Sequence, residues 1–215
     1  MNEPILRRML SSWRYRLAFM GAERQVMGGL WIGVASPHWD DDDKKLLSKV
    51  VSAVQLLATH DPKRFARIRR DLKRVFVFWI PGSWGRYFAP LDMCLLDTAF
   101  VADATTTPEL LAATIAHEAT HARLTKSGIG YDRSIQPRVE RICLKAELDF
   151  AAKLPNAQRV REVAEASMAA ADSYWSSPER AQRYRQAYMD AVERLPWPKW
   201  LRQLLKKRVA RKGAA

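Results

Sequence analysis

Residues 107–126 constrain the fold more than any other stretch of this chain, because they carry the local signals of a buried helix. Thr107 is a favourable N-cap, and Pro108 suits the first helical position. An apolar stripe recurs at helical spacing and consists of Leu111, Ile115, Ala119 and Ala122. The many alanines keep this helix thin, which is typical of a helix packed between other elements. The sequence therefore predicts a helix in the protein interior.

The same helix contains the motif His117-Glu118-Ala119-Thr120-His121. Residues four apart lie one turn apart on one helical face, so the two imidazoles can bind a single cation. Glu118 is rotated by about 100° from His117 and can reach over the open side of that cation. Two neutral nitrogen ligands and a carboxylate base are what zinc-dependent peptide hydrolysis requires. The alternative is that the histidines are ordinary polar residues on a solvated or partly hydrogen-bonded face.

A catalytic zinc takes three protein ligands and a water, so a third ligand must come from elsewhere in the chain. A further helix is predicted from Pro137 onward, and it carries Glu140 and Glu147. These glutamates are seven residues apart and share a face, but they are separated by about 10.5 Å along the helix axis. They cannot both bind one ion, and at this point either of them is a candidate ligand.

The HExxH motif followed by a glutamate on the next helix resembles the gluzincin branch of the zincin metallopeptidases, the thermolysin-like arrangement. It also resembles small, uncharacterised bacterial metallopeptidases. The resemblance covers residues 91–152, and no third histidine or glycine follows at the spacing of the metzincins. In gluzincins the third ligand lies about twenty residues after the second histidine. The resemblance therefore assigns Zn²⁺ to His117, His121 and Glu140.

One departure from the gluzincin pattern concerns the group that orients the first histidine. The family often has an aspartate four residues after the ligand glutamate, whereas this chain has Leu144 there. Glu147 is a possible substitute, either as the hydrogen-bond partner of His117 or as the alternative third ligand. Asp149 points the wrong way on the predicted helix.

The resemblance implies a peptidase mechanism with Glu118 as general base, taking a proton from metal-activated water and delivering it to the leaving amine. A hydroxyl or cationic group should stabilise the oxyanion. Tyr131, which follows the glycine-containing turn after the HExxH helix, is the candidate that we carry forward. The other candidates are Arg138, His38 and His60.

The predicted fold is α+β and mostly helical, zincin-like, with a small sheet packed on the HExxH helix. Predicted helices cover 4–26 and 44–59, with two more within 155–194, and predicted strands cover 30–36, 75–80 and 91–101. In zinc peptidases a strand shortly before the metal helix offers an open edge to an extended substrate. The 91–101 strand is either that edge or an ordinary core strand. We expect one metallopeptidase domain over 1–195 and a basic tail over 196–215.

The chain has a net charge of +13 and a sequence pI near 10.1, which favours contact with polyanions or with an acidic membrane surface. Residues 199–215 contribute seven Lys or Arg and no acidic residue. Such a basic amphipathic tail either contacts anionic lipid or nucleic acid, or docks its apolar side on the domain. The competing function is therefore a non-catalytic basic helical binding module with an inert or structural HExxH motif. The oligomeric state is left open by the sequence.

The two cysteines, Cys94 and Cys143, are expected as free thiols of an intracellular protein. No run of 18 apolar residues is present, and the N-terminal residues interrupt their apolar positions with arginines. The sequence therefore predicts no membrane span and no signal peptide. We expect a cytoplasmic location.

Overall fold

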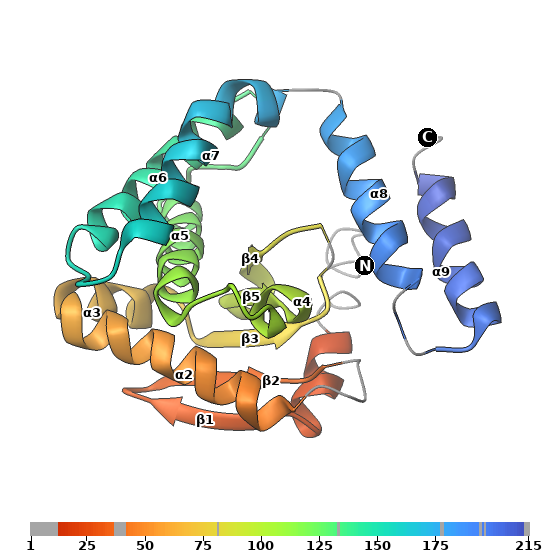
Figure 1. The fold of residues 1–215 in the computed structure, drawn as a ribbon, viewed down its shortest axis with the longest axis horizontal. Helices are drawn as coiled ribbons and strands as arrows, with labels where there is room; N and C mark the ends of the chain where they lie inside the picture. Colours follow the sequence, from red (N-terminus) through yellow and green to blue (C-terminus); the bar gives the residue numbers. More distant parts are fainter. Residues whose placement is uncertain are drawn as a thin grey trace.

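The computed structural model describes residues 13–36, 42–80, 82–132, 134–176, 179–193, 195 and 197–212. It confirms the mostly helical α+β fold, with one small mixed sheet and helices packed against it (Figure 1). The strands are β1 (Glu23–Met27), β2 (Leu30–Val34), β3 (Arg74–Phe78), β4 (Gly85–Phe88) and β5 (Met93–Asp97). Their order across the sheet is β1-β2-β3-β5-β4.

Strands β2, β3 and β5 are parallel, whereas β1 and β4 pair antiparallel at the two edges. The strand predicted over 91–101 is thus β5, an interior strand, and Thr98–Ala102 of that range form the short helix α4. A short 3₁₀ turn, η1 (Ala89–Leu91), connects β4 to β5. The edge strand nearest the HExxH helix is β4, which is absent from the strands predicted from the sequence.

The helix predicted over 4–26 extends too far. The described part of it is helical over 13–20, and residues 23–27 form β1 instead. Gly28 and Gly29 have φ values of 53° and 86°, so they form the turn that folds β1 back onto β2. Because four of the five β1 side chains are exposed, this edge strand lacks the alternating pattern by which strands are recognised.

The sheet has apolar side chains on both faces, and each face packs on different helices. Val75 and Val77 of β3 point into the main core, formed with α2 (Asp43–His60), α5 (Pro108–Lys126) and α7 (Gln158–Ser176). Phe76 of the same strand lies on the opposite face in a smaller, aromatic-rich core. There the 13–20 helix contributes Tyr15 and Phe19.

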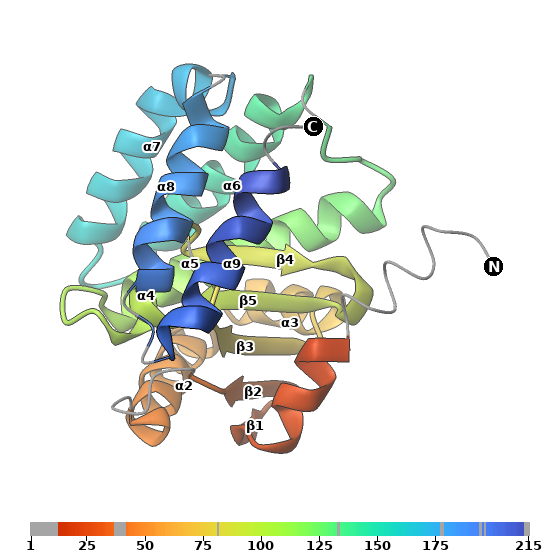
Figure 2. The same ribbon diagram turned by 90° about the vertical axis from the view of Figure 1, so that its right-hand side faces the viewer.

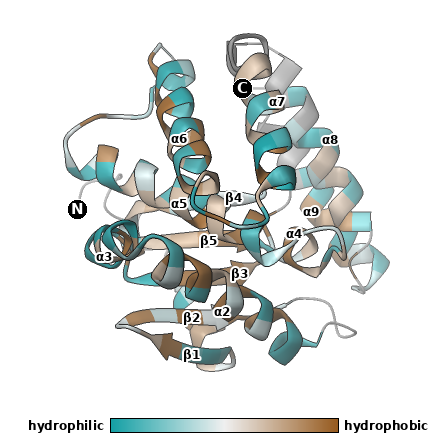
Figure 3. Cartoon of the chain, turned by 60° about the vertical axis from the view of Figure 1, so that its left-hand side comes forward, coloured by the Kyte–Doolittle hydropathy of each residue, from teal (hydrophilic) through white to brown (hydrophobic). Residues whose placement is uncertain are grey.

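Helix α5 occupies the centre of the molecule. It contacts α2, α3 (Pro62–Asp71), α6 (Gln136–Ala151) and the edge strand β4. The central strands β3 and β5 are coloured as hydrophobic in Figure 3, whereas α3 is largely hydrophilic. The HExxH segment is therefore held between the sheet and a second helical layer, as the alanine-rich sequence predicts.

The C-terminal region forms α8 (Glu179–Glu193) and α9 (Lys199–Lys212), which lie side by side (Figure 2). Arg202 donates a 2.6 Å hydrogen bond to the Glu193 carbonyl oxygen, and Lys206 pairs with the Glu193 carboxylate. Trp79, just after β3, contacts Tyr188 and Trp197. The predicted basic tail is thus largely helical and packs partly on α8.

None of the helices in the described ranges combines the length and the apolar character needed to cross a bilayer.

Candidate metal centre

Helix α5 begins where the sequence predicts. The Thr107 hydroxyl accepts a 3.3 Å hydrogen bond from the Leu110 backbone N–H, and Pro108 occupies the first turn. The helix ends at Lys126, beyond which Gly128 takes a φ of 80°. His117 and His121 lie on the side of α5 that faces α6, so the two helices together build the site.

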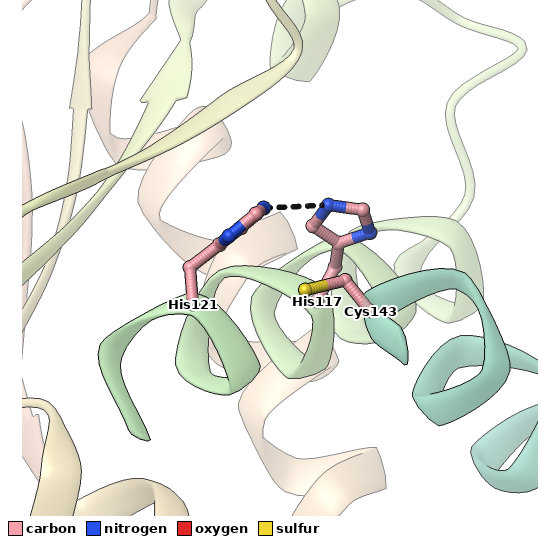
Figure 4. Close-up of side chains that lie close together, drawn as sticks. All are labelled: His117, His121 and Cys143. Carbon is pink, nitrogen blue, oxygen red and sulfur yellow. Dashed lines mark hydrogen bonds between the residues drawn. The ribbon is translucent and has the colours of Figure 1, made fainter. Parts of the chain in front are cut away.

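Three potential ligand groups, two imidazoles and one carboxylate, converge between these helices. The Nε2 atoms of His117 and His121 are 3.1 Å apart. Glu140 approaches both rings, with Oε2 lying 3.3 Å from His117 Nε2 and Oε1 lying 3.6 Å from His121 Nε2. The carboxylate is almost completely buried, and Figure 4 shows the two imidazoles turned toward each other.

These separations fit a zinc ligand set. Two atoms that each lie 2.0–2.1 Å from a tetrahedral zinc are about 3.3 Å apart. The three observed separations run from 3.1 to 3.6 Å, so the ligand atoms need only small adjustments to bind one ion. Glu140, rather than Glu147, is the glutamate that faces both Nε2 atoms.

Glu147 lies on the other side of His117. Its carboxylate pairs with Nδ1 of the imidazole, which is the ring nitrogen that does not face His121. An ionised carboxylate there accepts a hydrogen bond from Nδ1–H and leaves the Nε2 lone pair free for a metal. The structure therefore places Glu147 as the hydrogen-bond partner of His117, the first of the two roles left open for it. Leu144, at the position of the family aspartate, is buried.

Tyr131 reaches the site from the α5–α6 connection. Its hydroxyl donates a hydrogen bond to Glu140 Oε1 and accepts one of 2.7 Å from the Gln136 side-chain amide. Its ring meets His121 edge-on, with ring centroids 5.2 Å apart. In this arrangement Tyr131 positions the Glu140 carboxylate, while its oxyanion role stays a prediction.

Glu118 lies between α5 and β4 and is 6% exposed. The Tyr87 backbone N–H donates a hydrogen bond to its carboxylate. The edge strand approaches so closely that a Cβ added to Gly85 would lie 3.1 Å from Glu118 Oε1. Burial raises the pKa of Glu118 to about 7, which suits a base that works near neutral pH, and a nearby dication would lower that value.

The electrostatics of the two histidines differ. Burial disfavours the imidazolium of His117, but hydrogen bonds with Glu140 and Glu147 outweigh burial and hold the pKa of His117 well above its usual range. Burial and the charge of His117 lower the pKa of His121 to about 4. Three buried carboxylates thus face one cationic imidazolium, and a dication would balance the remaining negative charge.

One side chain of the cluster, Cys143, was not among the predicted ligands. Cys143 is fully buried on α6, and its Sγ lies within 4.8 Å of ligand atoms of both His117 and His121 (Figure 4). The signal was present, because Cys143 follows Glu140 by three residues and so shares its helical face. Burial, reinforced by Glu140, raises the pKa of its thiol.

The remaining oxyanion candidates are not joined to the cluster. Arg138 is exposed on the first turn of α6, and His60 is the last residue of α2. Within the described part of the chain, neither makes a hydrogen bond or ion pair with the histidines or glutamates of the site. His38 lies outside the described residues.

Comparisons with protein-family models, with curated proteins and with solved structures found no match for this chain.

Proposed function

We propose that this protein is a zinc-dependent metallopeptidase of the gluzincin-like type. The observation that carries the proposal is the convergence of His117 Nε2, His121 Nε2 and the Glu140 carboxylate within 3.1–3.6 Å of one another. Two further observations support the proposal: Glu147 pairs with His117 Nδ1, and the buried Glu118 adjoins His117 in the chain. A purely structural pair of histidines would not require three buried glutamates around it.

A zinc ion held by these residues would polarise a substrate carbonyl and activate a water molecule as nucleophile. Glu118 then accepts the proton of the attacking water and passes it to the leaving amine. Glu147 keeps the proton of His117 on Nδ1, so that Nε2 stays available as a ligand. Tyr131 holds Glu140 in place, and its hydroxyl is the candidate donor for a developing oxyanion.

The sheet supplies a surface for an extended peptide. β4 pairs with β5 on one side only and forms the sheet edge beside α5. Its Tyr87 N–H points to Glu118, so this edge borders the proposed base. A substrate strand that adds to β4 would run past the metal-binding residues, which assigns to β4 the substrate-binding role that the sequence analysis considered for residues 91–101.

The test uses the Glu118→Gln variant, which keeps size and hydrogen bonding but removes the base. We expect the zinc-loaded native chain to cleave members of a mixed peptide library, with products identified by mass spectrometry. Glu118→Gln should bind zinc and cleave at least about a hundredfold more slowly. Cleavage by Glu118→Gln at the native rate would refute the assigned base. No cleavage by the zinc-loaded native chain across a broad library would favour the non-catalytic binding module.

A second candidate function is contact with an anionic membrane surface through α9, and we infer it from the part of this helix that is not docked. Trp200 and Leu204 lie one turn apart and are 68% and 59% exposed, and Lys207 on the next turn is also exposed. An exposed aromatic and aliphatic pair beside cations suits anionic lipid headgroups.

Co-sedimentation with vesicles tests this membrane contact. The native chain should bind phosphatidylserine vesicles and not phosphatidylcholine vesicles, and the Trp200→Ala, Leu204→Ala double variant should bind less. Equal binding to both lipids, or retention on nucleic acid alone, would contradict it.

A further inference from the structure

The metal cluster contains a sulfur atom that the gluzincin-like ligand set does not use. Cys143 Sγ and one ring nitrogen from each of His117 and His121 all lie within 4.8 Å of one another. The cysteine side chain is fully buried, and Figure 4 shows it extending from α6 toward the two histidines on α5. The other cysteine, Cys94, is equally buried but lies on β5 within the main apolar core.

The position of Cys143 on its helix explains how sulfur reaches the cluster. Glu140 and Cys143 are three residues apart on α6 and therefore project from the same face, toward α5. Zinc bonds of about 2.3 Å to sulfur and 2.0–2.1 Å to nitrogen place the two ligand atoms about 3.6 Å apart. Because these atoms already lie within 4.8 Å of one another, metal binding requires them to approach by at most about 1.2 Å.

We propose that Cys143 binds the metal as a thiolate beside His117, His121 and Glu140, in the fourth tetrahedral position. The thiolate and the catalytic water therefore compete for one position, and the thiolate must leave the ion before water binds there. A dication deprotonates a thiol that coordinates it, and the released proton passes to solvent. A mixed nitrogen, sulfur and oxygen set favours zinc-like ions over Mg²⁺, Ca²⁺ and Mn²⁺. The inference rests on the proposed metal site but not on peptidase activity.

Co²⁺ added to the metal-free full chain tests the proposal by absorption spectroscopy. The visible bands of tetrahedral Co²⁺ report that the ion is bound, and a near-ultraviolet charge-transfer band reports a cobalt–sulfur bond. We expect both features in the native chain and in Cys94→Ser, the matched control with the other buried cysteine replaced. Cys143→Ser should keep the visible bands, lose the near-ultraviolet band and bind Co²⁺ at least about tenfold more weakly.

The native spectrum decides the matter even where a variant fails to fold. Visible bands without a near-ultraviolet band in the native chain would overturn the sulfur ligand, and so would a band that persists in folded Cys143→Ser or Cys143→Ala. Should hydrolysis still depend on Glu118 in that case, the proposed function survives and only the role of Cys143 falls. A native chain that binds no Co²⁺ and no Zn²⁺ would overturn both proposals.

Discussion

Replacing Glu147 should weaken zinc binding although Glu147 does not face the ion. Its carboxylate pairs with His117 Nδ1, while His117 Nε2 lies 3.1 Å from His121 Nε2 and 3.3 Å from Glu140 Oε2. Removing the partner of Nδ1 frees the imidazole to change its tautomer and to rotate, which costs ligand basicity and orientation. The effect should therefore appear in affinity rather than in the identity of the ligands.

The magnitude follows from what each substitution removes. In Glu147→Gln the amide oxygen still accepts from Nδ1–H but the charge is lost, so we expect zinc to bind about tenfold more weakly, or about 1.4 kcal/mol. Glu147→Ala removes the acceptor as well, and we expect a loss of about a hundredfold, or about 2.7 kcal/mol. Asp149→Asn, an exposed carboxylate on the same helix, is the matched control and should leave the affinity unchanged.

The assay is competition for zinc with a chromophoric chelator at fixed pH, with circular dichroism to verify the fold. The reasoning is refuted if Glu147→Ala binds zinc within a factor of about two of the native chain. It is equally refuted if Asp149→Asn weakens binding as much as Glu147→Gln does.

Three further predictions concern stability. Asp61→Asn should lower the unfolding free energy by about 2–4 kcal/mol, because Asp61 is buried, caps α3 and accepts a 2.7 Å contact from Lys153. Burial raises the pKa of Asp61, but the Lys153 contact and hydrogen bonds from Arg64 outweigh burial and hold it below its usual value. The unfolding free energy of the native chain should therefore fall as the pH is lowered below about 4, and that of the variant should fall less. Gly85→Ala should lower the unfolding free energy, measured by urea denaturation, by about 1–3 kcal/mol, because the added Cβ lies within 3.4 Å of neighbouring atoms. Gly130→Ala is the control and should leave it almost unchanged, because the added Cβ meets no atom within 4 Å. Zinc at about one hundred times its Kd should raise the unfolding free energy by about 2.7 kcal/mol and raise the melting temperature, and a chelator should reverse the rise. An unchanged melting temperature would contradict a zinc site formed in the native state.

Local sequence signals predicted the part of the site that lies along α5. The cap at Thr107, the spacing of His117 and His121 and the alanine-rich stripe are properties of one helix, and the helix forms where they indicate. The pairing of α5 with α6 is not encoded locally, so helix geometry alone left Glu140 and Glu147 open as the third ligand and only the family resemblance favoured Glu140. In the structure the two glutamates contact different ring nitrogens of His117, as their separation along the helix axis requires.

The features that the sequence did not predict, the two edge strands and the position of Cys143, have a common physical cause. Strands β1 and β4 are edge strands of five and four residues, with few buried side chains, so neither shows a two-residue apolar alternation. Cys143 was interpreted only as a free thiol, because the distance from its Sγ to α5 depends on how two helices pack. Features that depend on long-range packing are those that the sequence pattern did not reveal.

The central claim, that the HExxH helix binds zinc, is tested most directly by the zinc content of the purified chain, measured by mass spectrometry after zinc loading and desalting. His117→Ala is the test variant, and His60→Ala is the matched control, because His60 ends α2 away from the cluster. We predict about one zinc per chain in the native protein and in His60→Ala, and very little in folded His117→Ala. A folded native chain that retains no zinc, or a His117→Ala variant that retains it fully, would contradict the account.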